Sequence, residues 1–305
     1  MAFDIDRFRT EKRYSNTAPV SELMEDLGVL ARFDVEMDVV KRRWQRRAFI
    51  VGGVGAGLFV LSNVLDSELN PTLTSGLLFG GIGLLIVMVV LLFKAFRFGR
   101  NDLEDRRYQL PTLLLRRLGR DIAPEEPVSL ELDFHAIDHK AKWKGKGMAG
   151  TWKTNEFEDP WLSLQARLRD GTHLRLAMTE WLQKRSRTRR SPGGKYKTKH
   201  KQKSGTYLQA QLRVKPERHP GLARLQSAAR SAVKLPPTVA LTKLEVSDDR
   251  LGLRARMDSD WEAAEYVQLP SRDATRTCLM MLLSLYQVLN FSTSQRKQLP
   301  ARASP

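Results

Sequence analysis

Two long apolar stretches, separated by only ten residues, constrain this chain more than any other feature. Residues 48–65 and 76–93 each run for 18 residues without one ionisable side chain. A helix rises about 1.5 Å per residue, so each stretch covers roughly 27 Å of a hydrocarbon core that is about 30 Å thick. The sequence therefore predicts a transmembrane hairpin over residues 48–96, with an outer loop at residues 66–75.

Basic residues flank both stretches, and the loop between them has none. The flanking residues are Lys41, Arg42, Arg43, Arg46 and Arg47 on one side and Lys94, Arg97 and Arg100 on the other, whereas the loop holds Asp66 and Glu68. The positive-inside rule then predicts an integral membrane protein with both termini in the cytoplasm. Because residues 1–47 are polar, we expect the first stretch to stay in the bilayer rather than to be cleaved as a signal peptide. The arginine-rich, compact chain favours a bacterial inner membrane.

Each stretch contains a pair of glycines four residues apart, Gly53 with Gly57 and Gly76 with Gly80. Such small-xxx-small pairs let helix backbones approach closely. In an antiparallel hairpin the two pairs lie at opposite depths, so each is expected to pack against large residues of the neighbouring helix or against another copy. A homo-oligomer, and with it a pore or transporter accessory subunit, stays an alternative. The lack of ionisable groups in either stretch favours an anchor over a conduit.

The two stretches divide the chain into five predicted parts. These are a cytoplasmic N-terminal segment with an amphipathic helix (1–47), the hairpin (48–96), a juxtamembrane linker (97–126), a basic cytoplasmic α+β domain (127–291) and a disordered tail (292–305). The N-terminal helix is inferred from apolar residues spaced by three or four between Leu23 and Val40, which line one helix face. Residues 1–19 are expected to be irregular, and residues 111–118 to form a short amphipathic helix that can lie in the membrane interface.

Short alternating apolar runs after Pro124 predict the strands of an antiparallel sheet with helices packed on one face. A three-residue loop, 169–171, with Gly171 in the left-handed position keeps the apolar faces of the flanking strands together, which a two-residue turn does not. A turn at Asp248 and Asp249 predicts a second hairpin. The expected pairs are Ala166 with Leu174, Leu164 with Leu176, Leu244 with Leu253 and Val246 with Leu251.

The last predicted element is a helix that Ser271 is expected to cap. Its wide apolar face consists of Ala274, Cys278, Met281, Leu282, Leu285 and Leu289. The single cysteine therefore has a predicted role in core packing, and it excludes an internal disulfide.

The net charge of +17 is concentrated in the C-terminal domain, where residues 127–305 carry 33 Lys or Arg against 17 Asp or Glu. Ten of these basic residues fall in one run without an acid: Lys184, Arg185, Arg187, Arg189, Arg190, Lys195, Lys197, Lys199, Lys201 and Lys203. The ends of the run can pair as strands around a turn at residues 191–194. We predict that this run binds an anionic partner, either lipid headgroups of the inner leaflet or an acidic protein; a solvated hairpin tip is the alternative. Nucleic acid is less favoured, because Tyr196 is the only aromatic residue in the run.

In a second basic run, lysines are interleaved with Trp143, Trp152 and the glycines Gly145, Gly147 and Gly150. Its lysines are Lys140, Lys142, Lys144, Lys146 and Lys153. Lysine and tryptophan together suit a membrane interface, but a strand with its lysines exposed to solvent that leads into a glycine-rich turn gives the same pattern. The strand is the favoured interpretation.

The sequence contains no recognisable catalytic, cofactor or metal motif. His135 and His139 lie near Asp133 and Asp138, but a four-residue spacing presents two rings on one face only in a helix, and this segment is predicted to be strand and loop. We therefore predict a non-enzymatic, membrane-anchored binding or scaffold protein with no metal or cofactor. An enzyme with an unrecognised site is the remaining alternative, and it requires a pocket lined by His135, His139 or Asp133.

Overall fold

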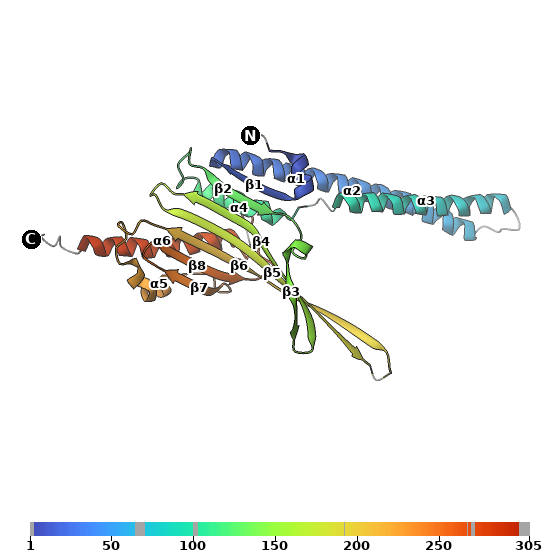
Figure 1. Cartoon of the computed structure of the whole chain (residues 1–305). Coiled ribbons are helices and arrows are strands. Elements are labelled where there is room, and N and C mark those ends of the chain that lie inside the picture. The colour runs from blue at the N-terminus through green and yellow to red at the C-terminus, as the bar shows by residue number, and fades with distance from the viewer. Residues whose placement is uncertain are drawn as a thin grey trace, which may run out of the picture. The chain divides into compact units, whose positions relative to one another are not determined.

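The computed structural model describes residues 3–64, 71–99, 103–191, 193–266, 268–269 and 272–298 (Figure 1). The chain forms two compact units. Residues 28–105 form the first, here called the helical unit, and residues 1–27 and 106–305 form the second, here called the sheet unit. The N-terminal residues thus belong with the sheet and not to a separate segment, which differs from the predicted division of the chain.

The helical unit is an antiparallel pair of long helices. Helix α2 (Val20–Val64) begins in the sheet unit and continues into the helical unit, and α3 is Pro71–Gly99. The ammonium group of Lys94 lies 5.1 Å from the ring centre of Trp44. Both helices are long and apolar enough to cross a membrane. Of the predicted outer loop, residues 66–70 lie outside the described residues and residues 71–75 are already helical.

The close contact between α2 and α3 is made by glycines other than the predicted ones. A Cβ atom on Gly55 would lie 2.9 Å from Cβ of Leu84, and a Cβ atom on Gly81 would lie 2.9 Å from the carbonyl oxygen of Gly55 and from the amide nitrogen of Phe59. Gly53 and Gly57 each lie two residues from Gly55. Positions two residues apart on a helix point about 200° apart, so these two glycines face away from the contact that Gly55 makes. The predicted glycines, Gly53, Gly57, Gly76 and Gly80, have no described atom within 4 Å of such a Cβ. Oligomerisation through them stays a prediction.

The sheet unit is built on an antiparallel sheet, as predicted, and the sheet has eight strands. Seven strands follow the order β1-β2-β4-β5-β6-β8-β7, and β3 pairs with the end of β4. The strands are β1 (Arg13–Ala18), β2 (Val128–Asp133), β3 (Trp143–Ala149), β4 (Trp152–Arg167), β5 (His173–Arg190), β6 (Tyr196–Arg213), β7 (Ala240–Val246) and β8 (Arg250–Met257).

The N-terminal residues are regular, contrary to the sequence-based expectation. Residues Ile5–Glu11 form helix α1, and β1 pairs along its whole length with β2. Only Tyr14 and Ala18 of β1 are buried, so the strand carries too weak an alternation to be detected in the sequence. The side chain of Asp26 on α2 accepts hydrogen bonds from the Tyr14 hydroxyl (2.8 Å) and the Asn16 amide (3.0 Å), which fixes this edge of the sheet to the start of α2.

Both predicted hairpin registers are confirmed. The structure pairs Leu164 with Leu176, Ala166 with Leu174, Leu244 with Leu253, and Val246 with Leu251. Gly171 has a positive φ of 84°, and its amide donates to the carbonyl of Leu168 at 2.8 Å, as a three-residue loop with a left-handed glycine requires.

Three α-helices complete the sheet unit: α4 (Asp105–Leu118), α5 (Gln226–Ala232) and α6 (Ala274–Gln298), with short 3₁₀ turns at Lys140–Lys142 and Leu222–Leu225. The leucines of α4 are buried: Leu110, Leu113, Leu114, Leu115 and Leu118. The predicted interfacial helix at 111–118 is therefore a core helix, because the sheet supplies the apolar partner that a bilayer would otherwise provide.

Helix α6 presents its predicted apolar face to the core, where Cys278 and Met281 are completely buried. The cap is Asp273, whose carboxylate accepts from the amide of Arg276 at 2.8 Å; Ser271 lies outside the described residues. The helix continues to Gln298, so the first half of the predicted disordered tail, residues 292–298, is helical. The remaining residues 299–305 are not among those described.

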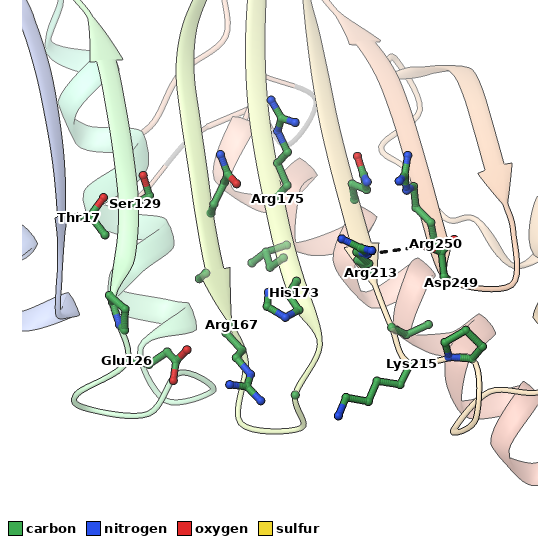
Figure 2. Close-up of a pocket in the computed structure, with 18 of the residues that line it drawn as sticks. Thr17, Glu126, Ser129, Arg167, His173, Arg175, Arg213, Lys215, Asp249 and Arg250 are labelled. Carbon is green, nitrogen blue, oxygen red and sulfur yellow. Dashed lines mark ion pairs between the residues drawn. The ribbon is translucent and has the colours of Figure 1, made fainter.

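The two faces of the sheet differ sharply in composition. Leu164, Leu176 and Leu253 lie in one cross-strand row and are buried on the face that the helices cover. The opposite face, here called the open face, carries polar side chains such as Gln165 and Arg175. Figure 2 shows side chains of this face in front of the strands, with helices behind them.

Candidate anion-binding surface

The predicted basic run forms the hairpin end of β5 and β6, here called the basic ribbon (residues 184–203). Each of these strands has 18 residues, against a typical strand length of about five or six, and their ends project from the sheet (Figure 1). The register pairs Arg185 with Lys201, Arg187 with Lys199, and Arg189 with Lys197. The predicted pairing of the ends of the run is thus confirmed.

Seven of the ten predicted residues lie on a single face of the ribbon, because opposite residues in a register point to the same side. They are Arg185, Arg187, Arg189, Lys197, Lys199, Lys201 and Lys203. Lys184 and Arg190 point to the other face, and Lys195 lies in the turn before β6. Lys184 is neutralised there by the carboxylate of Asp138 at 2.7 Å.

The seven cations of this face repel one another. Three of the cross-strand pairs place like charges directly opposite one another, which is destabilising. Within the described part of the chain, no carboxylate lies within 4.0 Å of any of these seven side chains. A bound anion would relieve this repulsion between like charges.

Aromatic side chains that the sequence run did not contain join the same face. Both Arg187 (5.1 Å) and Lys201 (5.4 Å) hold their cationic groups over the ring of Trp152. Farther along the strands, Arg254 lies 4.0 Å from the ring centre of Tyr207. These rings belong to β4 and β6, and only the strand register brings them beside the basic residues.

The cationic face of the ribbon continues into the open face of the sheet, because β5 and β6 pair without a register shift over their whole length. The open face of β5, β6 and β8 comprises 22 side-chain positions, of which 12 are Arg or Lys and none is Asp or Glu. Within the sheet proper, the opposite positions on the same strands form the core, as at Leu174, Leu176, Leu208, Leu212 and Leu253. The basic surface therefore extends far beyond the predicted run.

At the end of the sheet remote from the ribbon, the open face forms a groove of about 1030 Å³. Arg167, His173, Arg213 and Arg250 follow one another across four strands in a single cross-strand row of this groove. Figure 2 shows this row and the ion pair that joins Arg213 to Asp249 at 3.7 Å. The groove is lined by charged, amide and hydroxyl side chains together with apolar ones such as Pro127, Val214 and Pro216.

A buried charge cluster lies behind the point where the ribbon leaves the sheet. The guanidinium of Arg107, on α4, donates to the carboxylates of Asp159 (2.9 Å) and Glu180 (2.8 Å), which face each other on β4 and β5. The ammonium of Lys142 lies 2.7 Å from Asp159 and 3.1 Å from Asp133. Lys142 is buried, although the sequence places it in an exposed basic run. The cluster thus ties α4 to the strands that carry the ribbon.

Two stacked tryptophans extend this cluster. The rings of Trp161 and Trp261 are nearly parallel, with centres 5.4 Å apart, and both are buried. The Trp261 indole N–H donates to Glu180 at 2.8 Å, while the guanidinium of Arg106 lies 4.3 Å from the Trp261 ring centre. The stack therefore covers one side of the buried carboxylate and excludes water from it.

Asp133 gives a pH-dependent prediction. Its burial acts to raise its pKa, but the His135 amide, the Lys142 ammonium and the His135 ring overcome that effect and lower the pKa from 3.8 to about 2. A lowered pKa means stability that is present above about pH 4 and lost as the pH falls toward 2, about 2 kcal/mol in total. We expect Asp133→Asn to flatten the acid limb of the unfolding free energy, measured by urea titration at several pH values. An unchanged acid limb would assign the effect to other carboxylates.

The structure brings the rings of His135 and His139 to 4.6 Å from each other, although the segment is not helical. The ring of His135 is engaged by Asp133 at 2.9 Å. Among the described residues, no group of three or more His, Cys, Asp or Glu is placed to hold a metal ion. The groove of Figure 2 is not lined by His135, His139 or Asp133, so it does not supply the pocket that the enzyme alternative requires.

In agreement with the favoured strand interpretation, Lys144 and Lys146 lie in β3 and Lys153 at the start of β4; Lys140 and Lys142 instead form the 3₁₀ turn before β3. Large side chains are nonetheless exposed on this hairpin and on the basic ribbon: Met148 (66 %) and Tyr196 (75 %) lie near the turns, and Trp143 (47 %) lies at the start of β3. These two hairpins therefore combine lysines with exposed aromatic and apolar groups.

Fold and surface together define an antiparallel β-sheet protein with a basic open face and two helices apolar enough to span a bilayer. No protein-family model, no curated protein and no solved structure matches the chain.

Proposed function

We propose that this chain is a non-enzymatic, membrane-anchored protein whose basic ribbon binds anionic lipid headgroups. In this proposal α2 and α3 insert as a hairpin and leave both termini in the cytoplasm. Apolar side chains on the outside of the helical unit support insertion, because water would solvate them poorly. Examples, with their exposed fractions, are Phe49 (69 %), Val60 (59 %), Phe79 (71 %), Ile86 (60 %) and Phe93 (66 %).

The observation that carries the binding proposal is the arrangement of charge on the ribbon. Seven cations share one face, three pairs are directly opposed, and no described carboxylate lies within 4.0 Å of them. Each Lys or Arg near an anionic leaflet contributes on the order of 1 kcal/mol, so even partial contact outweighs the repulsion within the ribbon.

Exposed aromatic and apolar side chains on the two hairpins favour a lipid surface over an acidic protein. Trp143, Met148 and Tyr196 lie close in sequence to lysines of β3 and β6. Aromatic rings beside lysines are typical of segments that rest at the headgroup level of a bilayer. A hydrophobic anchor elsewhere in the same chain raises the effective concentration of the ribbon at the membrane.

An environment-sensitive dye on the ribbon turn tests this proposal. The single native cysteine, Cys278, is buried, so Ser191→Cys provides one accessible labelling site. With the full chain in nanodiscs, we expect the dye to shift to the blue in anionic lipid and not in zwitterionic lipid, and the shift to weaken with salt. A dye at Ser247→Cys, in the turn between β7 and β8, is the matched control and should not respond.

The decisive variant replaces the five alternating lysines of the ribbon, Lys195, Lys197, Lys199, Lys201 and Lys203, by glutamine. We expect it to abolish the anionic response of the dye while the chain stays in the nanodisc. A wild-type dye that reports the same environment in both lipids would overturn lipid binding and direct attention to an acidic protein partner.

A further inference from the structure

The part of the open face that belongs to the sheet proper differs chemically from the ribbon. Its cations on β4, β5, β6 and β8 are all arginines: Arg167, Arg175, Arg213, Arg250, Arg254 and Arg256, here called the arginine face. The ribbon face, by contrast, has four lysines among its seven cations. Arginine presents a planar fork that matches a phosphate group bidentately, whereas lysine acts as a point charge.

The arginine face is free to bind a ligand. Among the described residues, only Arg213 of these six has a carboxylate within 4.0 Å, and that pair, with Asp249, is long (3.7 Å) and exposed. Acidic side chains border the face: Glu131 on β2 and Glu245 on β7 point to the same side of the sheet, and Glu245 is paired there with Lys243 at 2.5 Å.

Two aromatic rings lie between the arginines. Tyr207 lies beneath the guanidinium of Arg254 (4.0 Å), and Trp181 lies beneath that of Arg256 (5.9 Å). Trp181 lies against Gly205, where an added Cβ would be only 2.8 Å from the indole nitrogen. The glycine lets the ring lie close to the sheet, so ring and guanidinium form flat platforms of the kind on which a base can stack.

Glutamines supply hydrogen-bonding groups to the same face. Gln165, Gln209 and Gln211 alternate with the arginines in the register, and Gln165 and Gln211 line the groove of Figure 2. An amide side chain can both donate a hydrogen bond to the edge of a base and accept one from it. A surface that binds only phosphate headgroups does not need both capacities. The open face of these strands also lacks the exposed large apolar side chains of the hairpin tips, within the described residues.

From this combination we propose that the arginine face binds single-stranded nucleic acid, as a second site distinct from the lipid-binding ribbon. Phosphates engage the arginines and bases stack on the aromatic platforms, which duplex base pairing would prevent. From His173 to Trp181 the strand extends over roughly 26 Å, the order of length of a short single-strand site of about four nucleotides.

The test measures fluorescence anisotropy of a labelled oligothymidylate of about 12 nucleotides with the full chain in zwitterionic nanodiscs. We expect single-stranded oligonucleotide to bind and a duplex of equal length to bind at least tenfold more weakly. Tyr207→Ala should weaken binding about tenfold through the loss of one stacking platform. The triple variant Arg175→Gln, Arg213→Gln and Arg250→Gln should lower the slope of log affinity against log salt by about 2, since each phosphate contact contributes about 0.7.

A matched variant of equal charge, Lys197→Gln, Lys199→Gln and Lys201→Gln on the ribbon, separates the two proposals. We expect this lysine variant to weaken the lipid response of the dye at position 191 and to keep most of the affinity for the oligonucleotide. We expect the arginine variant to weaken oligonucleotide binding and to keep most of the lipid response of the dye. Equal loss of oligonucleotide binding in both variants, or equal affinity for duplex and single strand, would overturn the nucleic-acid site. The lipid proposal is judged independently by the dye.

Discussion

Replacing Arg107 by methionine is expected to lower the free energy of unfolding by about 3–5 kcal/mol, which is a large fraction of the stability of a domain of this size. The guanidinium is 2 % exposed and holds Asp159 and Glu180, both buried. It also donates to the backbone carbonyl of Asp133 at 2.7 Å. Methionine fills most of the volume but leaves two buried carboxylates short of a positive partner.

The measurement is urea unfolding of the full chain in detergent, followed by tryptophan fluorescence, since Trp161 and Trp261 flank the cluster. Arg116→Gln is a matched control on the same helix, because Arg116 forms only an exposed ion pair with Glu265. We expect that control to change the unfolding free energy by less than about 1 kcal/mol. Equal effects of the two variants would show that the buried cluster is not a unit of stability.

A thermodynamic cycle with Glu180→Gln measures the coupling within the cluster. Removing the carboxylate and the guanidinium together leaves fewer unpaired charges than removing either one. The double variant should therefore lose less unfolding free energy than the sum of the losses in the two single variants. Glu180 also accepts a hydrogen bond from Trp261 and pairs with Arg106 at 3.2 Å. Part of the stability lost in Glu180→Gln therefore stays lost in the double variant. Simple additivity would contradict a direct interaction with Arg107.

The sequence could predict elements whose pattern is local. The hairpin of Leu164 and Leu176 followed from alternation and one loop glycine, and the apolar face of α6 followed from helical spacing. The pairing of the basic ribbon was likewise visible in the sequence, since its two halves are separated only by a turn. Local periodicity and turn chemistry decide such features, so no distant partner has to be known.

The sequence could not show features that depend on distant partners. Lys142 was assigned to an exposed run, because nothing near it in the sequence shows that Asp133 and Asp159 will enclose its ammonium. The aromatic residues of the open face were missed for the same reason: Trp152 and Arg187 are separated along the chain and meet only through the register. The extent of the basic surface is thus a property of strand pairing.

The glycines of the hairpin illustrate the same limit in a helix. Spacing in the sequence singled out Gly80, but which side of a helix faces its neighbour depends on the packing of the pair. The structure places Gly81 in the close contact, against the backbone of Gly55 and Phe59, while no described atom lies within 4 Å of a Cβ on Gly80. Adjacent residues of one helix therefore make a matched pair of sites for substitution.

Replacing Gly81 by isoleucine is expected to separate α3 from α2, whereas the same change at Gly80 should have little effect. The atoms that an added Cβ on Gly81 would meet, at 2.9 Å, belong to the backbone and cannot rotate away. Overpacking commonly costs about 1–3 kcal/mol, and contact with a fixed backbone places this site at the upper end. The two variants have equal composition and hydropathy, so a difference between them reports packing alone.

The measurement is the midpoint of unfolding of the helical hairpin when the full chain in mild detergent is titrated with SDS, followed through the fluorescence of Trp44, whose ring lies under Lys94 of the partner helix. We expect Gly81→Ile to lower the midpoint strongly and Gly80→Ile to leave it near that of the wild type. A lowered midpoint for Gly80→Ile that depends on protein concentration would instead identify Gly80 in a contact between copies, because a contact within one chain is independent of concentration.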